Sequence, residues 1–263
     1  MLFSASSFSQ INNVAKEKII VLPLGATEQH GPHLAVSTDT DIVTALALAA
    51  EKRMEDDIVL CPALSIGSSH HHLSFGGTIS ISAGTYVQLI IELVESLLHN
   101  GFRRIVLLNG HGGNINPAKQ ALTLLSGKYD TSLKPNIVLV TYWELAGKAF
   151  SGLPPMQSPA LSHACEYETS LMMHLYPDKV FSEEMERAGR PDSNGYIPWE
   201  DDEPFKGVTM IKQTQFITSN GSSGEPQLAS AEKGHYLFEK AAESFLEFLH
   251  SFKSWPFLES LKK

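Results

Sequence analysis

Residues 18–39 read KIIVLPLGATEQHGPHLAVSTD and join a short apolar run to a polar loop. The run is rich in Ile and Val, which predicts a buried strand. Glu28 and His30 follow it two positions apart, and an extended backbone points side chains at that spacing to one face. In open α/β sheets ligands bind outside the carboxyl ends of strands. The loop at 25–39 is therefore a candidate site, although Glu-x-His alone is also compatible with a polar loop of no function.

Predicted strands and helices alternate along the rest of the chain. Apolar runs predict strands at 57–64, 104–108 and 136–143, and an alternating pattern predicts one at 78–82. Helical spacing of apolar residues predicts helices at 41–54, 85–100, 117–125, 168–175 and 230–252. Such alternation predicts parallel pairing and a doubly wound α/β sheet. The polar stretches at 151–159 and 187–224 read as loops, so we expect one domain over 1–263 with its core at about 10–250.

Composition excludes several classes of protein. With 43% hydrophobic and 19% charged residues among 263, the chain is not of the disordered class. The net charge of −9 and the lack of a basic cluster argue against a nucleic-acid partner. We expect no membrane partner, because the longest apolar stretch falls far short of the roughly 20 residues of a span. Two cysteines and a Ser-rich start without signal-peptide features predict a cytoplasmic setting.

Two further segments carry histidines and carboxylates. Residues 109–114 read NGHGGN after a predicted strand, and residues 162–170 read SHACEYETS before a predicted helix. The glycines around His111 would also suit a phosphate-binding loop, but the rest of that motif is absent. Acids at a helix start can serve only to compensate the helix dipole. Of Glu166 and Glu168, we expect that role for one and not for both.

The three segments together favour a metal site over separate polar loops. Mixed His, Asp and Glu ligation suits Zn²⁺, Mn²⁺ or Fe²⁺. Two such ions about 3.5–4 Å apart need a bridging carboxylate and activate a shared water.

Four ordered motifs resemble the creatininase (creatinine amidohydrolase) family. They read ATEQHGPHLAVSTD, NGHGGN, HACEYETSLM and GEPQLASAEKG, and the match runs from about residue 10 to residue 250. The resemblance implies a three-layer α/β/α fold with a mainly parallel sheet, often assembled as a homohexamer. It also implies hydrolysis of C–N bonds in linear or cyclic amides at a binuclear metal centre, hence two divalent ions per chain.

The resemblance also implies roles for individual residues. One ion is held by Glu28, Asp39 and His111, and the other by His30 with Asp39 as the bridge. His163 falls on the residue that handles protons near the substrate, and Trp143 falls on an aromatic that lines the pocket.

The sequence departs from creatininase itself in the pocket and in one ligand. Gly112 and Gly113 stand where creatininase has a tyrosine and a ligand glutamate, and Pro159 replaces a second pocket tryptophan. The NGHGGN form is shared by relatives that are not creatininases, among them formamidopyrimidine deformylases and a mycofactocin-processing peptidase. The replacement ligand is expected from Glu166 or Glu168. Glu166 is favoured because it lies three residues after His163, which leaves Glu168 to cap the helix or to hold a ligand histidine.

Other histidines and cysteines are assigned smaller parts. In the run at 70–72 we expect His72 to form part of the pocket wall and its two neighbours to lie on the surface. His33 suits hydrogen bonding to a ligand better than ligation, and Cys165 is expected to be a packing residue.

These observations predict a metal-dependent amidohydrolase that acts on a small-molecule amide. A peptidase or a formamidopyrimidine deformylase with the same core is the first alternative. A non-catalytic protein that binds metal or a small molecule on the same scaffold is the second.

Overall fold

The computed structural model describes residues 1–128, 135–148, 150, 156–158, 161–186 and 210–258. Its strands are β1 (Ile19–Leu24), β2 (Ile58–Leu60), β3 (Arg104–Asn109) and β4 (Asn136–Thr141). Its helices are α1 (Phe8–Val14), α2 (Thr38–Arg53), α3 (Ala83–His99), α4 (Ile115–Lys128), α5 (Tyr142–Ala146), α6 (Glu166–Leu175) and α7 (Ala231–Lys253). Short 3₁₀ turns include His70–Phe75, Gly112–Asn114 and Thr214–Phe216.

The described strands form one parallel sheet in the order β2-β1-β3-β4. Ile19 of β1 pairs with Ile58 on one side and with Arg104 on the other. Every residue of β1 is buried, as a central strand covered on both faces requires.

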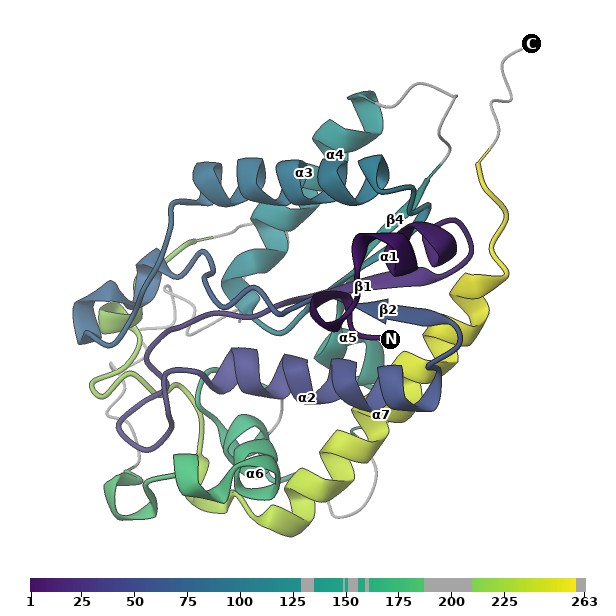
Figure 1. Cartoon of the computed structure of the whole chain (residues 1–263). Coiled ribbons are helices and arrows are strands. Elements are labelled where there is room, and N and C mark those ends of the chain that lie inside the picture. Colours follow the sequence, from purple (N-terminus) through teal and green to yellow (C-terminus); the bar gives the residue numbers. More distant parts are fainter. Residues whose placement is uncertain (129–134, 149, 151–155, 159–160, 187–209, 259–263) are drawn as a thin grey trace.

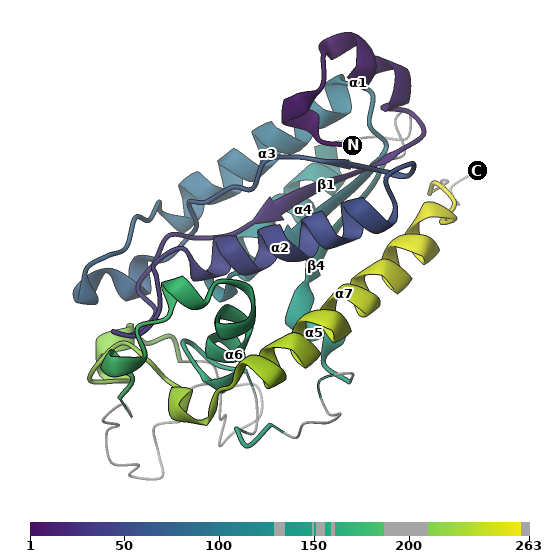
Figure 2. The ribbon, with the colours of Figure 1, turned by 60° about the horizontal axis from the view of Figure 1, so that its bottom comes forward.

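Side-chain alternation along β1 divides the core into two layers. Ile19 and Val21 belong to a cluster with α2, α5, α6 and α7, whereas Ile20 and Leu22 belong to a cluster with α1, α3 and α4. Figures 1 and 2 show β1 between α3 on one side and α2 on the other. The predicted three-layer α/β/α fold is therefore confirmed.

Several boundaries differ from the sequence prediction. The predicted strand at 78–82 is wrong, because Ile79 and Ser80 make only isolated bridges to Thr27 and Gly67. The run at 57–64 contributes only the short strand β2, and the chain turns from β4 directly into α5. The predicted loop at 151–159 lies mostly outside the described residues, and so does the part of the 187–224 loop before 210. No helix within the described ranges is long and apolar enough to cross a membrane.

The carboxyl ends of β1 and β3 lie side by side, since Leu24 pairs with Asn109. The loop at 25–37 leaves β1 there and leads into α2, and the NGHGGN segment leaves β3 beside it. This edge of the sheet brings the first two motifs together.

Helices α6 and α7 pack closely through a glycine. A Cβ added to Gly234 would lie 1.8 Å from the carbonyl oxygen of Ser170 in α6.

We expect Gly234→Ala to lower the free energy of unfolding by about 1–3 kcal/mol, because helix backbones must separate to admit the methyl group. Gly127→Ala in α4 is the control, since its Cβ would meet no atom within 4 Å. We expect it to be neutral or to stabilise by up to about 1 kcal/mol; urea unfolding compares the two, and equal effects would contradict the packing argument.

Candidate metal centre

Four side chains from three elements meet at the carboxyl edge of the sheet. Glu28 and His30 follow β1, Asp39 lies in the first turn of α2, and His111 follows β3. All four are at most 3% exposed. Charged groups are almost never buried this deeply unless they are paired or bind a metal.

Asp39 lies between two imidazoles. Its Oδ1 is 3.2 Å from His30 Nε2, and its Oδ2 is 3.1 Å from His111 Nδ1. One carboxylate thus presents a separate oxygen to each of two histidines, which is the arrangement that a carboxylate bridging two ions needs.

The nitrogens that face Asp39 are His30 Nε2 and His111 Nδ1, and each carries a lone pair when its ring is neutral. His30 Nδ1 donates to the Glu28 carbonyl oxygen at 3.1 Å, and His111 Nε2 lies 3.1 Å from Ser69 Oγ and 3.4 Å from the Ser68 carbonyl oxygen. Such contacts fix the tautomer of a metal-ligating histidine and turn its other nitrogen toward the ion. When both rings are neutral, lone pairs of nitrogen and of carboxylate oxygen face one another, so a proton or a cation must lie between them.

Three atoms of the cluster lack a hydrogen-bond partner although they are fully buried. They are Glu28 Oε2, His30 Nε2 and Asp39 Oδ2. Buried polar atoms are nearly always satisfied, and two of these three, His30 Nε2 and Asp39 Oδ2, face other members of the cluster. A divalent cation fits this donor set. The side chains of Glu28, His30 and Asp39 offer ligand atoms within 4.8 Å of one another.

The electrostatics of the cluster favour positive charge. Burial by itself would lower the pKa of His30, but Asp39 outweighs burial and raises it to about 10. Burial would also lower the pKa of His111, but Glu28 raises it by more. The pKa of His111 is therefore well above its usual value. Protons and metal ions compete for the same lone pairs, so the groups that hold a proton here would also hold an ion.

Glu168 joins this cluster. Its Oε2 lies 3.9 Å from His30 Nε2 and accepts a hydrogen bond from the backbone N–H of Ala164 at 2.6 Å. Burial raises the pKa of the carboxyl to about 7. His30, His163 and Glu168 form another group whose ligand atoms lie close enough to hold an ion.

Glu166 does not join it, which corrects the sequence prediction that preferred it as a ligand. Its carboxylate accepts hydrogen bonds from the backbone N–H groups of Gln157 and Ser158 and pairs with Lys233 Nζ at 2.5 Å. Residues two apart on a helix point about 200° from each other. Since α6 begins at Glu166, its two acids cannot face the same site.

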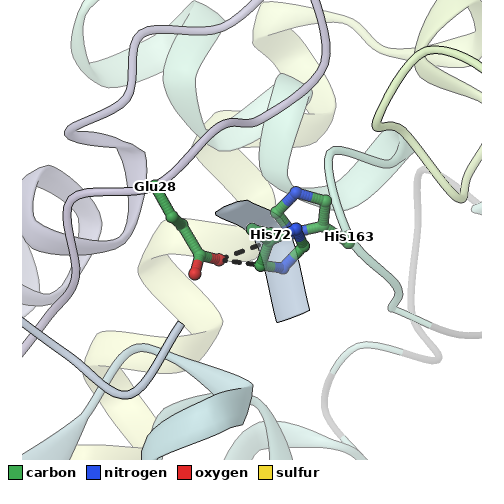
Figure 3. Close-up of side chains that lie close together, drawn as sticks. All are labelled: Glu28, His72 and His163. Atoms are coloured by element: carbon green, nitrogen blue, oxygen red, sulfur yellow. Dashed lines mark ion pairs between the residues drawn. The ribbon is translucent and has the colours of Figure 1, made fainter. Parts of the chain in front are cut away.

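His72 and His163 lie beside Glu28 and stack on each other. His72 Nε2 lies 3.5 Å and His163 Nδ1 3.6 Å from Glu28 Oε1, and the two rings stack with centroids 4.1 Å apart (Figure 3). Burial, and then the charge of His30, hold the pKa of His163 well below its usual value. His163 is therefore neutral near pH 7.

The other predicted residues are placed as follows. Trp143 lies in α5, edge-on to Tyr142 at 5.0 Å, and its role in a pocket stays a prediction. His71 is half-buried and grouped with Glu28 and His111, not on the surface as its place in the run suggested. His33 bonds Thr169 Oγ1 at 3.0 Å. Sequence reasoning missed Gln29, although it stands between two candidate ligands in Glu-Gln-His.

Comparisons with known proteins identify the family of this chain. A family model described as "Creatininase: Creatinine amidohydrolase" matches residues 4–249. The mycofactocin precursor peptide peptidase of Mycobacterium tuberculosis (strain CDC 1551 / Oshkosh) is 31% identical over 227 residues, which cover 83% of this chain and 79% of the relative. Creatinine amidohydrolase of Pseudomonas putida is 29% identical over 183 residues, covering 63% and 67%.

Solved structures show the same fold. A creatininase structure described as the Mn form is 22% identical with a TM-score of 0.74. One described as the Zn-Zn type is 23% identical with a TM-score of 0.75, and each match covers 95% of this chain and 97% of the other. At these identities the likeness concerns the fold alone.

The Glu166–Lys233 pair generates a prediction about stability. Burial would raise the pKa of Glu166, but Lys233 and the backbone donors lower it overall. A carboxylate with a pKa lowered by folding stabilises the protein above its unfolded pKa, and this contribution is lost as the pH falls below it. We expect Glu166→Gln to cost about 3–5 kcal/mol of unfolding free energy at pH 7, and less as the pH drops below about 4.5.

Denaturant unfolding at several pH values measures this difference. Glu243→Gln is the control, because Glu243 pairs with Lys240 on the exposed face of α7. We expect little change there at any pH. A cost for Glu166→Gln that stayed constant into the acid range would contradict the ion-pair explanation.

Proposed function

The chain belongs to the creatininase family of metal-dependent amidohydrolases, and we propose that it hydrolyses a C–N bond with a water activated by two divalent ions. The observation that carries this proposal is Asp39, whose two oxygens face His30 and His111 from within a buried, partly unpaired cluster. Zn²⁺, Mn²⁺ and Fe²⁺ all suit such mixed nitrogen and oxygen donors.

Each ion would have three ligands from this chain. We assign Glu28, Asp39 and His111 to the first ion, and His30, Asp39 and Glu168 to the second. Three protein ligands are the usual number at a catalytic zinc, where a further position stays open. When bound, the ions supply Lewis-acid polarisation and activation of water at neutral pH.

Gly113 supports the assignment of Glu168. A Cβ at this position would lie 2.2 Å from the Ser68 carbonyl oxygen and 2.4 Å from His111 Nε2. No side chain fits there, so a ligand carboxylate must come from another element. Glu168 is the buried carboxylate that α6 directs at His30.

His163 would move the proton. Its Nδ1 faces the cluster beside Glu28, and its lowered pKa leaves the ring neutral and ready to accept a proton. The same Nδ1 can return that proton to the departing nitrogen, which is a poor leaving group as an anion.

The substrate class is narrowed by the missing aromatics. Gly112 offers no side chain for stacking on a small planar ring. We therefore favour a small-molecule amide that is linear, such as a formamide, over the cyclic compound creatinine. A peptide is the second candidate. The match to the mycofactocin precursor peptide peptidase supports it, because that match covers 83% of this chain against 63% for creatinine amidohydrolase. Deformylation and non-catalytic binding remain alternatives for the experiments below. The homohexamer and the cytoplasmic setting also stay predictions.

The first prediction from this assignment concerns metal content. We expect Glu168→Gln to bind about one divalent ion in place of two and to lose nearly all activity, since the second ion keeps only His30 and Asp39. Asp39→Asn should weaken both sites, because its carboxylate serves both ions. Inductively coupled plasma mass spectrometry on protein loaded with Zn²⁺ or Mn²⁺ measures the change.

Glu166→Gln is the matched control on the same helix. We expect it to retain both ions, because its carboxylate faces Lys233. Loss of an ion in Glu166→Gln with retention in Glu168→Gln would return the ligand role to Glu166. Full amide hydrolysis after exhaustive chelation would refute metal dependence.

The second prediction concerns substrate preference. We expect creatinine to be hydrolysed more slowly than the best formamide or short peptide, because each lost aromatic contact removes about 0.5–1.5 kcal/mol. Steady-state kinetics over cyclic ureas, formamides and peptides gives the ranking of kcat/KM. A higher value for creatinine than for every other compound would contradict the argument from Gly112. Bound metal without hydrolysis of any of these compounds would favour the alternative of a non-catalytic protein that binds metal or a small molecule.

A further inference from the structure

Gln29 lies between two candidate ligands in the sequence and turns its side chain toward His72 and His163. It is buried, and its amide contacts both rings and two backbone groups. Since an amide nitrogen only donates and an amide oxygen only accepts, these contacts determine where protons sit on the neighbouring rings.

Two backbone groups fix the orientation of the Gln29 amide. Its Oε1 accepts from the N–H of Gly31 at 2.9 Å, and its Nε2 donates to the carbonyl oxygen of Gly221 at 3.0 Å. The flipped amide would set two donors against each other at one end and two acceptors at the other. Nε2 is therefore the atom that faces His72.

Gly221 packs closely against the Gln29 amide. Its φ of +87° lies in the left-handed region, and a Cβ there would be 2.1 Å from Gln29 Oε1. The loop around residue 221 approaches Gln29 as closely as a glycine permits, so the amide has no room to rotate away.

The orientation of the amide decides the tautomer of His72. Gln29 Nε2 lies 2.7 Å from His72 Nδ1, so this ring nitrogen accepts and the proton sits on Nε2. Thr214 Oγ1 is 3.0 Å from the same Nδ1, but a hydroxyl can donate or accept and does not choose. His72 thus presents an N–H toward Glu28.

The backbone of the same residue decides the tautomer of His163. Its Nε2 lies 2.7 Å from the Gln29 carbonyl oxygen, which only accepts, so Nε2 carries the proton. Gln29 Nε2 is also 3.0 Å from this nitrogen, but its two protons are directed at His72 and Gly221. His163 therefore presents a lone pair at Nδ1.

We propose that Gln29 is a positioning residue that gives the two stacked histidines opposite roles. Its side chain makes His72 a hydrogen-bond donor toward the reaction space, and its carbonyl makes His163 an acceptor there. A donor suits the carbonyl oxygen of an amide, and an acceptor suits a proton in transit. His72 in this tautomer cannot ligate an ion, although it stands in a group with Glu28 and His163 that could hold one. The assignment of protons stands on hydrogen bonding alone, whereas its effect on turnover rests on the proposed function.

The experiment reads the tautomers directly. Protein labelled with ¹⁵N-histidine and loaded with diamagnetic Zn²⁺ gives separate ring-nitrogen shifts for protonated and unprotonated positions, and His72→Asn identifies the His72 signals. We expect Nε2–H in the native protein. In Gln29→Glu a carboxylate oxygen replaces the amide donor, so we expect the His72 proton to move to Nδ1 while the Zn²⁺ content stays constant.

Two further variants complete the test. Gln29→Met removes the donor without adding charge, and we expect it to lose the single Nε2–H form. Thr214→Val removes the other neighbour of His72 Nδ1 and should keep it. With a hydrolysed amide in hand, we expect Gln29→Glu and Gln29→Met to lower kcat by about 100-fold with a much smaller change in KM.

The outcomes separate this proposal from the proposed function. Retention of Nε2–H in both Gln29 variants would overturn it, and so would loss of that form in Thr214→Val alone. Inversion in Gln29→Glu supports the proton assignment even if no amide in the panel is hydrolysed. In that case the kinetic consequence falls together with the proposed function.

Discussion

Three buried carboxylates, those of Glu28, Asp39 and Glu168, set the main constraint on this molecule. Burial of such a group costs several kcal/mol unless positive charge or hydrogen-bond donors face it. His30 and His111 each use one ring nitrogen for a contact with a backbone carbonyl or a serine. The other nitrogen of each ring is a hydrogen-bond acceptor when the ring is neutral. Among the described residues, the cationic groups that pair with these carboxylates are histidines, so positive charge comes from protons on their rings, and the pKa of His30 rises to about 10. A site arranged in this way has a strong preference for cations.

The sheet and α2 hold these carboxylates in place. A Cβ at Gly25 would lie 2.4 Å from Thr40 Oγ1, and one at Gly110 would lie 2.7 Å from the Cβ of Val43. The ends of β1 and β3 thus pack directly on the first turns of α2, where Asp39 lies. This close packing of rigid elements keeps the Asp39 oxygens within reach of histidines that leave two different strands.

Much of the fold could be predicted from the sequence, because period-2 and period-3.6 patterns report burial directly. The strand at 78–82 could not, since its alternation reflects a segment that touches Thr27 and Gly67 without joining the sheet. The spacing of Glu28 and His30 predicted a shared face, and both side chains lie in the cluster. The choice between Glu166 and Glu168 depended on the starting residue of α6, and a change of two residues turns a helix face by more than half a turn. The orientation of the Gln29 side chain could not be predicted either, because one of the two backbone groups that fix it belongs to Gly221, which is 192 residues away in the sequence.

The crowding around Gly113 limits how related chains can exchange a ligand during evolution. A glutamate at this position is incompatible with the path of residues 68–71, because its Cβ would meet the Ser68 carbonyl oxygen at 2.2 Å and His71 Cε1 at 2.9 Å. The residue at position 113 and the loop before the His70–Phe75 turn must therefore change together, so a chain with a glutamate at this position needs a different path for residues 68–71.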